Sequence, residues 1–235
     1  TVDAKAAITS TGGDGINTFN VSTTAAIIAA AAGAVVAKHG NHTSTRVSGS
    51  ADVMSQLGVK LSGDVAVLQR CLRECGLAFL HAPLLHPAMK YAATVRKQLK
   101  IRTIFNLLGP LTNPAGARRQ VIGTCKRELT EKLGRVLAAR NAPRAWVPCS
   151  HEGLCDLSIT GPTQVTEVRD GEVSTFVVHP SELGLATAPL QALLNKEFIA
   201  ARTPSSEARK PSRNASSARA LSTAFAPSSA SGAAG

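Results

Sequence analysis

A glycine-rich turn between a short apolar strand and a long helix is the feature that most restricts the fold of this chain. We expect Lys5–Thr9 to end a strand, which Thr11-Gly-Gly-Asp-Gly15 follows. The alanine-rich run Ala25–Gly33 is expected to form the next helix, capped by Thr23 or Thr24. The N–H groups of such a turn can approach an anion closely, beside the positive end of the helix. An ordinary connection, in which the aspartate serves only the turn, is the alternative.

Strand-like and helix-like runs continue to alternate to about residue 200, which predicts an α/β fold. Gln164–Arg169 and Glu172–Val178 alternate around Asp170-Gly171, a pattern typical of a β-hairpin. The other predicted strands are Ala34–Lys38, Gln120–Cys125 and Arg144–Cys149, and the other predicted helices are Ala51–Leu57, Asp64–Cys75, Pro87–Leu99 and Glu128–Arg140.

The composition changes near residue 200. We expect residues 1–200 to form one α/β domain, and residues 201–235, which are mainly Ala, Ser, Pro and Arg, to form a low-complexity basic tail. Such a segment buries too little apolar surface to offset its ordering entropy, so we expect disorder. The tail contributes +4 of the formal net charge of +11. We favour a solvated tail over one that contacts nucleic acid.

The charge balance points to an anionic partner. Lys and Arg number 26 against 15 Asp and Glu, which suits either a phosphorylated small molecule or nucleic acid. Aromatic residues make up only 3%, which argues against stacking of single-stranded bases. No apolar run reaches the length of a membrane span, and the five cysteines lack the spacing of a disulfide scaffold, which favours a reducing cytosol.

Two further polar segments are expected to lie near the glycine-rich turn. Lys38-His-Gly-Asn41 ends one predicted strand, and Ser48-Gly-Ser50 opens the next helix. Ligands of an open parallel sheet collect beyond the carboxyl ends of its strands, where these loops should meet. Lys38 would then supply a positive charge to a phosphate, and Gly40 would allow close backbone approach. A lysine exposed to solvent at a strand end is the alternative.

A third segment begins with His86-Pro-Ala-Met-Lys90 and continues to Pro114. Arg96 follows His86 by nearly three helical turns, so both side chains can share one helix face. An arginine in that position can hold a carboxylate with two hydrogen bonds. An exposed basic helix face is the alternative.

Together these segments make the chain similar to the anthranilate phosphoribosyltransferase family. Seven motifs occur in the family's order: STGGDG at 10–15, TFNVST at 18–23, KHGN at 38–41, SGSAD at 48–52, HPAMK at 86–90, Val95-Arg96 and RTIFNLLGPLTNP at 102–114. The resemblance implies a large α/β domain, of the kind shared with nucleoside phosphorylases, with a central, mainly parallel sheet. It also implies a small helical domain, which we expect to be largely missing here because the chain begins at Thr1 without the upstream helices. The domain is thus expected to be incomplete at both ends.

The resemblance implies an activity. Phosphoribose would pass from 5-phosphoribosyl 1-diphosphate to anthranilate, giving N-(5-phosphoribosyl)anthranilate and diphosphate, in tryptophan biosynthesis. A cytoplasmic homodimer that uses Mg²⁺ and has no membrane partner is implied as well. Two alternatives remain open: a non-catalytic relative that binds nucleic acid through its basic, phosphate-binding surface, and a nucleoside phosphorylase. The RTIFNLLGPLTNP motif and Arg96 favour anthranilate over a nucleoside.

The resemblance also assigns residues to each ligand. Those expected to bind 5-phosphoribosyl 1-diphosphate are Ser10, Gly13, Asp14, Thr18, Asn20, Val21, Ser22, Thr23, Lys38, His39, Gly40, Asn41 and Ser50. Those expected around anthranilate are Asn41, His86, Arg96 and Gly109, with Arg96 on the carboxylate and His39 lining the pocket. Ser22 and Asp156 are the expected magnesium ligands.

Three departures from the family pattern affect these assignments. Ser10 replaces the first glycine of the turn, and after KHGN the chain has His42 and Thr45-Arg46 where the family usually has arginine and a serine pair. Cys155-Asp156 replaces an Asp-Glu pair that binds magnesium in the family. Because a hard cation prefers oxygen ligands, Cys155 should be a poor ligand, and Asp156 is one methylene shorter than glutamate. We therefore hypothesise weaker magnesium use.

Overall fold

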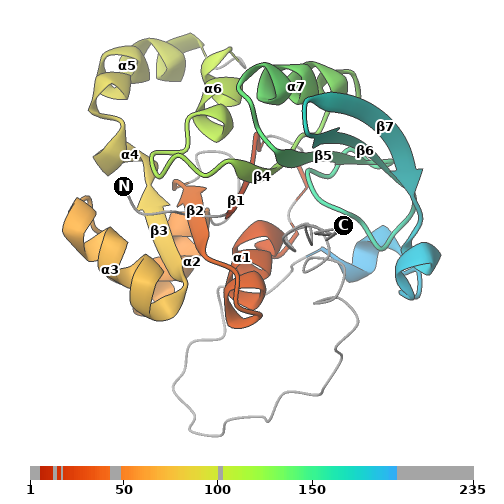
Figure 1. The fold of residues 1–235 in the computed structure, drawn as a ribbon, viewed down its shortest axis with the longest axis horizontal. Coiled ribbons are helices and arrows are strands. Elements are labelled where there is room, and N and C mark those ends of the chain that lie inside the picture. The colour runs from red at the N-terminus through yellow and green to blue at the C-terminus, as the bar shows by residue number, and fades with distance from the viewer. Residues whose placement is uncertain (1–5, 13–14, 17, 43–48, 100–102, 195–235) are drawn as a thin grey trace, which may run out of the picture.

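The computed structural model describes residues 6–12, 15–16, 18–42, 49–99 and 103–194, without the side chains of residues 93, 94, 96 and 97. Over these residues the chain forms a seven-stranded sheet in the order β3-β2-β1-β4-β5-β6-β7 (Figure 1). β1 to β5 run parallel to one another. β6 runs antiparallel to its neighbours β5 and β7. The strands are β1 Ala6–Ser10, β2 Val36–Gly40, β3 Leu77–His81, β4 Arg119–Gly123, β5 Arg144–Ser150, β6 Thr163–Arg169 and β7 Glu172–Val178.

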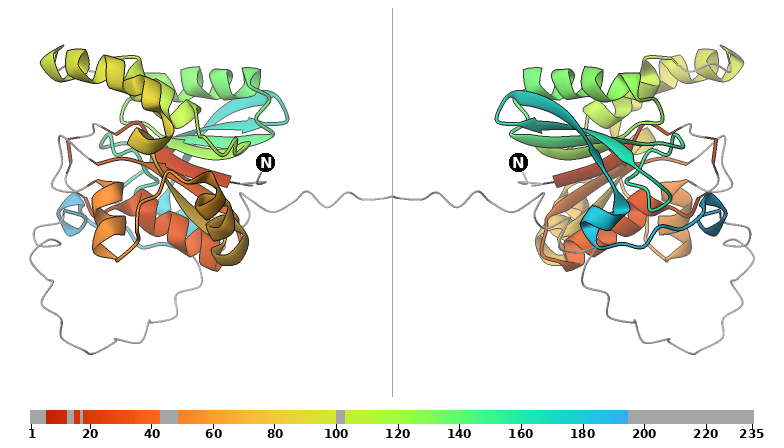
Figure 2. Two further views of the ribbon diagram at one scale, coloured as in Figure 1. Left: turned by 90° about the vertical axis from the view of Figure 1, so that its left-hand side faces the viewer. Right: turned by 90° about the vertical axis from the view of Figure 1, so that its right-hand side faces the viewer.

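Helices cover both faces of the sheet, as Figure 2 shows for α1 and α7. The helices are α1 Val21–Ala31, α2 Ser50–Gln56, α3 Val65–Cys75, α4 Ala82–Leu85, α5 Lys90–Leu99, α6 Phe105–Leu111 and α7 Glu128–Ala139, with 3₁₀ turns at Pro87–Met89, Pro180–Leu183 and Leu190–Ala192. The predicted α/β fold with a mainly parallel sheet is confirmed. Among the described residues, no helix is both long and apolar enough to span a bilayer.

Apolar side chains from alternate strand positions form the two sides of the core. On one side, Ile8 of β1 and Val36 of β2 pack against Ala26 and Ala29 of α1. On the other side, a second cluster packs β4, β5 and β6 against α7 through Ile122, Val147, Val168, Leu133 and Leu137. The strands β1, β2 and β3 are buried over four of their five residues, whereas the edge strand β7 is largely exposed.

The strand order determines where a ligand can bind. β1 lies between β2 and β4, so the direction in which strands are added along the sheet reverses at this point. Loops that leave the carboxyl ends of the strands diverge at such a reversal, and open α/β sheets bind ligands there. The glycine-rich turn after β1 lies at this edge.

Two predicted elements begin two or more residues from the predicted position. α1 begins at Val21, four residues before the predicted start, because the side chain of Asn20, and not Thr23 or Thr24, caps it by accepting a hydrogen bond from the Thr23 N–H (3.3 Å). β2 begins two residues later than predicted, since Gly33 adopts a positive φ of 93° and Ala34 still donates to a helix carbonyl. Lys38 therefore lies inside the strand, not at its end.

One strand and two helices were not predicted, and one predicted helix is divided. β3, α4 and α6 are absent from the elements predicted from the sequence. The helix predicted from Pro87 to Leu99 is a 3₁₀ turn followed by α5, and His86 precedes both. His86 and Arg96 therefore do not share one helix face, because the helical repeat on which that inference rested is interrupted. The predicted tail, residues 201–235, lies outside the described residues.

Candidate active site

The glycine-rich turn packs on the end of β4. The N–H of Thr11 donates to the carbonyl oxygen of Gly123 (2.8 Å), and the thiol of Cys125 donates to that of Gly12 (3.8 Å). Gly12 and Gly15 have φ of 61° and 70°, a region that favours glycine. Gly13 and Asp14, two of the predicted ligands, lie outside the described residues. Ser10, the last residue of β1, places the turn at the carboxyl edge of the sheet.

The amino end of α1 faces the same edge. The predicted residues Asn20, Val21, Ser22 and Thr23 form its cap and first turn, where a helix dipole favours a negative charge. Thr18 precedes this cap and pairs with Leu194 in an isolated bridge.

Two buried hydroxyl groups lie in the glycine-rich turn and in the first turn of α1. The Oγ1 atoms of Thr11 and Thr23 are buried and have no hydrogen-bond partner among the described residues. A buried polar atom normally has a partner, so each offers a position for a ligand oxygen. Sequence reasoning assigned Thr23 but missed Thr11. Its position directly after a strand, at the start of a glycine-rich turn, is the signal that could have identified it.

Lys38 is a buried cation in the middle of β2. Its side chain donates to the carbonyl oxygen of His39 (3.2 Å), and the residue is 3% exposed. Burial lowers the pKa of Lys38 to about 8, whereas the negative charge of Asp156 opposes this shift. The Asp156 carboxylate, in the loop after β5, therefore lies close enough to Lys38 to act on its charge. The expectation of a lysine available to a phosphate is strengthened, because a buried ammonium lacks the water that normally surrounds it.

Three residues predicted to line one pocket come together from three segments. The Nε2 atoms of His39 on β2 and His86 after α4 lie 3.2 Å apart, and their ring centroids 5.0 Å apart. His39 also hydrogen-bonds the backbone of Gly109 in α6. Burial, together with the charges of His86 and Lys38, lowers the pKa of His39 to about 4, although the Gly109 bond opposes this. His39 is thus neutral at physiological pH and offers a flat, uncharged wall.

Gly40, Asn41 and Ser50 form a tight junction between β2 and α2. A Cβ atom added to Gly40 would lie 2.1 Å from Ser50 Oγ and 2.8 Å from a ring atom of Phe79, so only glycine fits. Ser50 Oγ and the N–H of Ala51 donate to the carbonyl oxygen of Asn41 (3.4 and 3.2 Å). The predicted ligands Gly40, Asn41 and Ser50 are therefore neighbours.

The loop after β5 carries Asp156, one of the two expected metal ligands, and Cys155. A Cβ atom on Gly123 would lie 1.6 Å from the carbonyl oxygen of Cys155, so this loop lies directly on the end of β4. Cys155 is 3% exposed. Within the described ranges no group of three His, Cys, Asp or Glu side chains could hold a metal ion. Asp156 and Ser22 carry oxygen donors, the kind of ligand that Mg²⁺ prefers.

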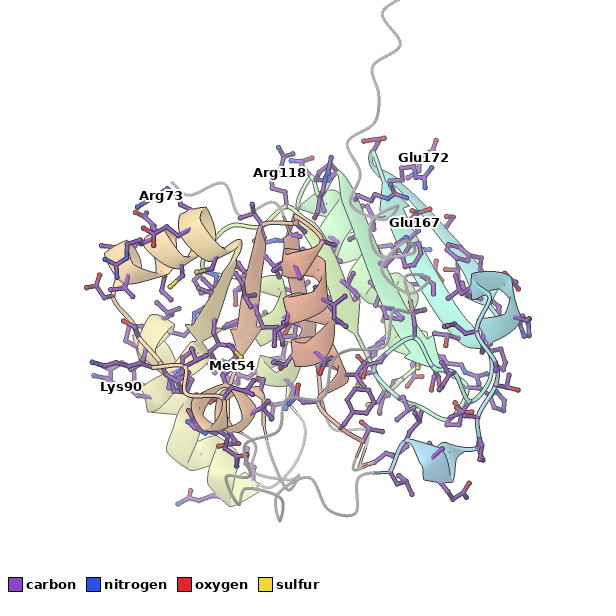
Figure 3. All side chains as sticks on the ribbon, turned by 90° about the horizontal axis from the view of Figure 1, so that it is seen from below. Met54, Arg73, Lys90, Arg118, Glu167 and Glu172 are labelled. Atoms are coloured by element: carbon purple, nitrogen blue, oxygen red, sulfur yellow. The ribbon has the colours of Figure 1, made fainter. Side chains whose placement is uncertain are left out.

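The predicted residues that the structure describes thus lie toward the carboxyl edge of the sheet. Figure 3 shows Arg118 and Glu172 at the opposite end, where β4 and β7 begin, whereas Met54 of α2 lies toward the carboxyl edge. Met54 packs with Ala51 and Phe79 and supports the junction at Gly40 from below. Arg96 lies in α5, and its side chain is outside the described set.

A glycine-rich turn, a helix amino end and a buried lysine near the carboxyl edge of a parallel sheet are together typical of α/β domains that bind phosphorylated ligands. The sequence matches, over residues 3–225, the family described as "Glycosyl transferase family, a/b domain". The chain belongs to this family.

Individual relatives carry a more specific name. The chain is 50% identical over 190 residues to anthranilate phosphoribosyltransferase of Anaeromyxobacter dehalogenans, which covers 81% of this chain and 56% of the relative. It is 47% identical to that of Symbiobacterium thermophilum over 85% of this chain and 57% of the relative. The resemblance predicted from the seven motifs is confirmed, and the chain spans about half the length of the curated relatives that it matches.

Solved structures agree. The anthranilate phosphoribosyltransferase of Thermus thermophilus superposes with a TM-score of 0.75 at 42% identity, covering 80% of this chain and 56% of that one. The Saccharomyces cerevisiae enzyme in complex with PRPP and Mg gives a TM-score of 0.72 at 33% identity, covering 81% and 53%.

Proposed function

We propose that the protein transfers phosphoribose from 5-phosphoribosyl 1-diphosphate to the amine of anthranilate, as a pentosyltransferase of tryptophan biosynthesis. One observation carries this proposal: Lys38, the His39–His86 pair and Gly109 converge beside the glycine-rich turn. Two structures of the Saccharomyces cerevisiae enzyme support it, because one contains PRPP and Mg and the other 4-fluoroanthranilate.

The donor half of the site stabilises a leaving diphosphate. When the bond from the anomeric carbon to oxygen breaks, negative charge develops on the diphosphate. The Lys38 ammonium, the first turn of α1 and the N–H groups of the turn after β1 are held in place before the reaction and lower the energy of that charge. A bound anion also favours the protonated form of Lys38, which opposes the effect of burial on its pKa.

The acceptor half mainly positions the arylamine. His39, His86 and Gly109 form a rigid wall, because each ring is fixed by a hydrogen bond. We propose that Asn41 and Arg96 hold anthranilate against this wall, with Arg96 on the carboxylate. An arylamine is already a nucleophile, so holding it close to the anomeric carbon supplies much of the rate enhancement.

We propose that Mg²⁺ accompanies the diphosphate, with Ser22 and Asp156 as its protein ligands. Bound there, the ion would neutralise charge on the leaving group. Because the chain supplies one carboxylate where the resembling family has two, substrate oxygens and water would complete its coordination shell.

Assembly and location are further proposals. The resemblance supports a homodimer and a cytoplasmic enzyme. The nucleic-acid alternative finds no support among the comparisons, and the relatives named above are anthranilate phosphoribosyltransferases, not nucleoside phosphorylases.

The decisive experiment follows the fluorescence of anthranilate. Incubation with 5-phosphoribosyl 1-diphosphate and Mg²⁺ should consume the fluorophore, and omission of the sugar diphosphate should prevent this. Replacing the two substrates by a nucleoside and inorganic phosphate tests the phosphorylase alternative. Unchanged anthranilate fluorescence, together with DNA binding that weakens steeply with salt, would contradict the proposal.

A further inference from the structure

A carboxylate that no ligand assignment uses lies in the loop between β5 and β6. Glu152 is near the start of this loop, which also carries Asp156, a proposed magnesium ligand. No helix or strand runs through residues 151–162. Because no regular ladder of backbone hydrogen bonds fixes the loop, the position of Asp156 depends largely on side-chain contacts.

Glu152 is tied to the flank of the loop that precedes Asp156. The Ser150 hydroxyl, at the end of β5, donates to the Glu152 carboxylate. Ser150 is fully buried, and its Oγ atom accepts a hydrogen bond from the Leu154 N–H (2.9 Å). The Ser150 N–H also donates to the Leu154 carbonyl oxygen (3.0 Å). Leu154, two residues before Asp156, is therefore held at both its backbone groups.

The same carboxylate is tied to the flank that follows Asp156. The Thr160 hydroxyl donates to it, and Thr160 Oγ1 lies 2.7 Å from Ser158 Oγ. Since the Thr160 proton is directed at the carboxylate, the Ser158 hydroxyl donates to Thr160. The Thr160 N–H donates in turn to Ser158 Oγ (3.0 Å), and the Ser158 N–H donates to Thr163 Oγ1 at the start of β6 (3.1 Å). Ser158, two residues after Asp156, is thus fixed as well.

Glu152 remains charged in a confined position. Its Oε1 atom would lie 3.2 Å from a Cβ atom added to Gly161, and its Oε2 atom is buried without a hydrogen-bond partner among the described residues. Burial alone would raise the pKa of Glu152, but hydrogen bonds from Thr160, from its own N–H and from Ser150 hold it below its usual value. A charged group with an unpaired buried oxygen costs free energy. Such a conflict with stability is typical of residues that serve a functional site.

Between its two flanks the loop rests on the end of β4 and lies close to Lys38. The Cys155 carbonyl oxygen packs so closely on Gly123 that a Cβ atom there would lie 1.6 Å from it. The charge of Asp156 acts on the buried ammonium group of Lys38. The hydrogen bonds that start at Glu152 therefore end on either side of the residue that lies beside the proposed diphosphate site.

We infer that Glu152 is a positioning residue, which holds the loop so that Asp156 lies beside Lys38, where both can act on the diphosphate and its Mg²⁺. The inference rests on the proposed function, which gives Asp156 a magnesium ion to bind. Without the charge of Glu152 both flanks are freed, Asp156 leaves its binding position more often, and more Mg²⁺ is needed to bind the sugar diphosphate. Partners that orient a metal ligand typically contribute about tenfold or more to metal affinity. Because Glu152 acts through hydroxyl groups and the backbone, its contribution is about threefold to tenfold.

Calorimetric titration with 5-phosphoribosyl 1-diphosphate at a series of Mg²⁺ concentrations tests this inference. Glu152→Gln, which keeps the shape but not the charge, should raise the Mg²⁺ concentration for half-maximal binding about threefold to tenfold. Glu172→Gln is the matched control, since this exposed glutamate lies at the opposite end of the molecule (Figure 3) and should change nothing. Thr160→Val, which removes one hydroxyl donor to Glu152, should shift the titration in the same direction by a smaller factor.

A double variant separates positioning of Asp156 from support of the fold. If Glu152 acts through Asp156, Glu152→Gln should add little to the effect of Asp156→Asn, because the group that it positions is already lost. Effects of the two substitutions that multiply, or a Mg²⁺ titration of Glu152→Gln equal to that of the unaltered protein, would overturn the inference and leave the proposed function intact. No binding by the unaltered protein at any Mg²⁺ concentration would overturn both. Denaturant unfolding without ligand identifies a variant that fails to fold; if Glu152→Gln does, Thr160→Val and its combination with Asp156→Asn decide the question.

Discussion

Replacing Lys38 by methionine should stabilise the free protein while destroying its affinity for the sugar diphosphate. Burial lowers the pKa of Lys38 from 10.5 to about 8. At 1.36 kcal/mol per pKa unit, the buried charge costs about 3 kcal/mol of folding free energy below pH 8. Methionine fills a similar volume without the charge, so the variant should be up to about 3 kcal/mol more stable at pH 7.

The lowered pKa of Lys38 also determines whether the stability rises or falls with pH. Since the folded pKa lies below the unfolded value, the unfolded chain binds more protons between pH 8 and 10.5. The stability of the unaltered protein should therefore rise through this window relative to Lys38→Met, until the difference between the two vanishes. Denaturant unfolding at several pH values from 7 to 10.5 measures this, and Lys60→Met, which removes an exposed lysine, is the matched control.

The same substitution, which should stabilise the protein, should weaken its binding of the sugar diphosphate. Without its ammonium group, Lys38→Met should bind 5-phosphoribosyl 1-diphosphate about 30-fold or more weakly, because a buried partner of the diphosphate is lost. Equal stability of the variant and the unaltered protein across the whole pH range would refute the argument for a destabilising buried charge. A stabilised variant that still binds the ligand tightly would refute the assignment of Lys38 to the site.

Three further perturbations address packing, metal and charge. Gly40→Ala should destabilise the protein by about 1–3 kcal/mol in denaturant unfolding, because its Cβ would lie 2.1 Å from Ser50 Oγ; an unchanged midpoint would contradict this. Restoring Cys155→Asp with Asp156→Glu should lower the Mg²⁺ concentration at half-maximal activity, and an unaltered magnesium titration would reject the weaker-metal hypothesis. Burial alone would raise the pKa of Glu167, but hydrogen bonds from an indole and an arginine hold it below its usual value. Its stabilisation is lost as the pH falls below about 4.5, so Glu167→Gln should show a shallower loss of thermal stability between pH 5 and 3.

Local patterns predicted most of the sheet because the information lay within each segment. The hairpin is confirmed, since Asp170 and Gly171 adopt the positive φ values, 51° and 91°, that a two-residue turn requires. β3 was missed because Leu77–His81 is a five-residue apolar run, and periodicity cannot distinguish such a run from buried helix. Gly76, with a φ of 68°, ends α3 directly before it and was the available signal.

The register of β2 shows why local reasoning placed Lys38 incorrectly. A charged residue is usually exposed, so a strand was predicted to end at Lys38. In the fold, the strand continues to Gly40, and Lys38 pairs with Phe79 of β3 in the interior of the sheet. Tertiary packing thus overrides the preference of lysine for water, and such a conflict between local preference and position is typical of functional residues.

The contacts that make the site could not be predicted from spacing. His39 and His86 are 47 residues apart, and the segment between them contains three helices and the strand that was missed. Their approach depends on β3 lying beside β2, because only then does the chain leave the sheet next to His39. The motifs indicated which residues belong together, whereas the strand order determines that they meet. A substitution that disturbs the pairing of β2 with β3 should therefore separate the donor and acceptor halves of the site, even if every motif residue is retained.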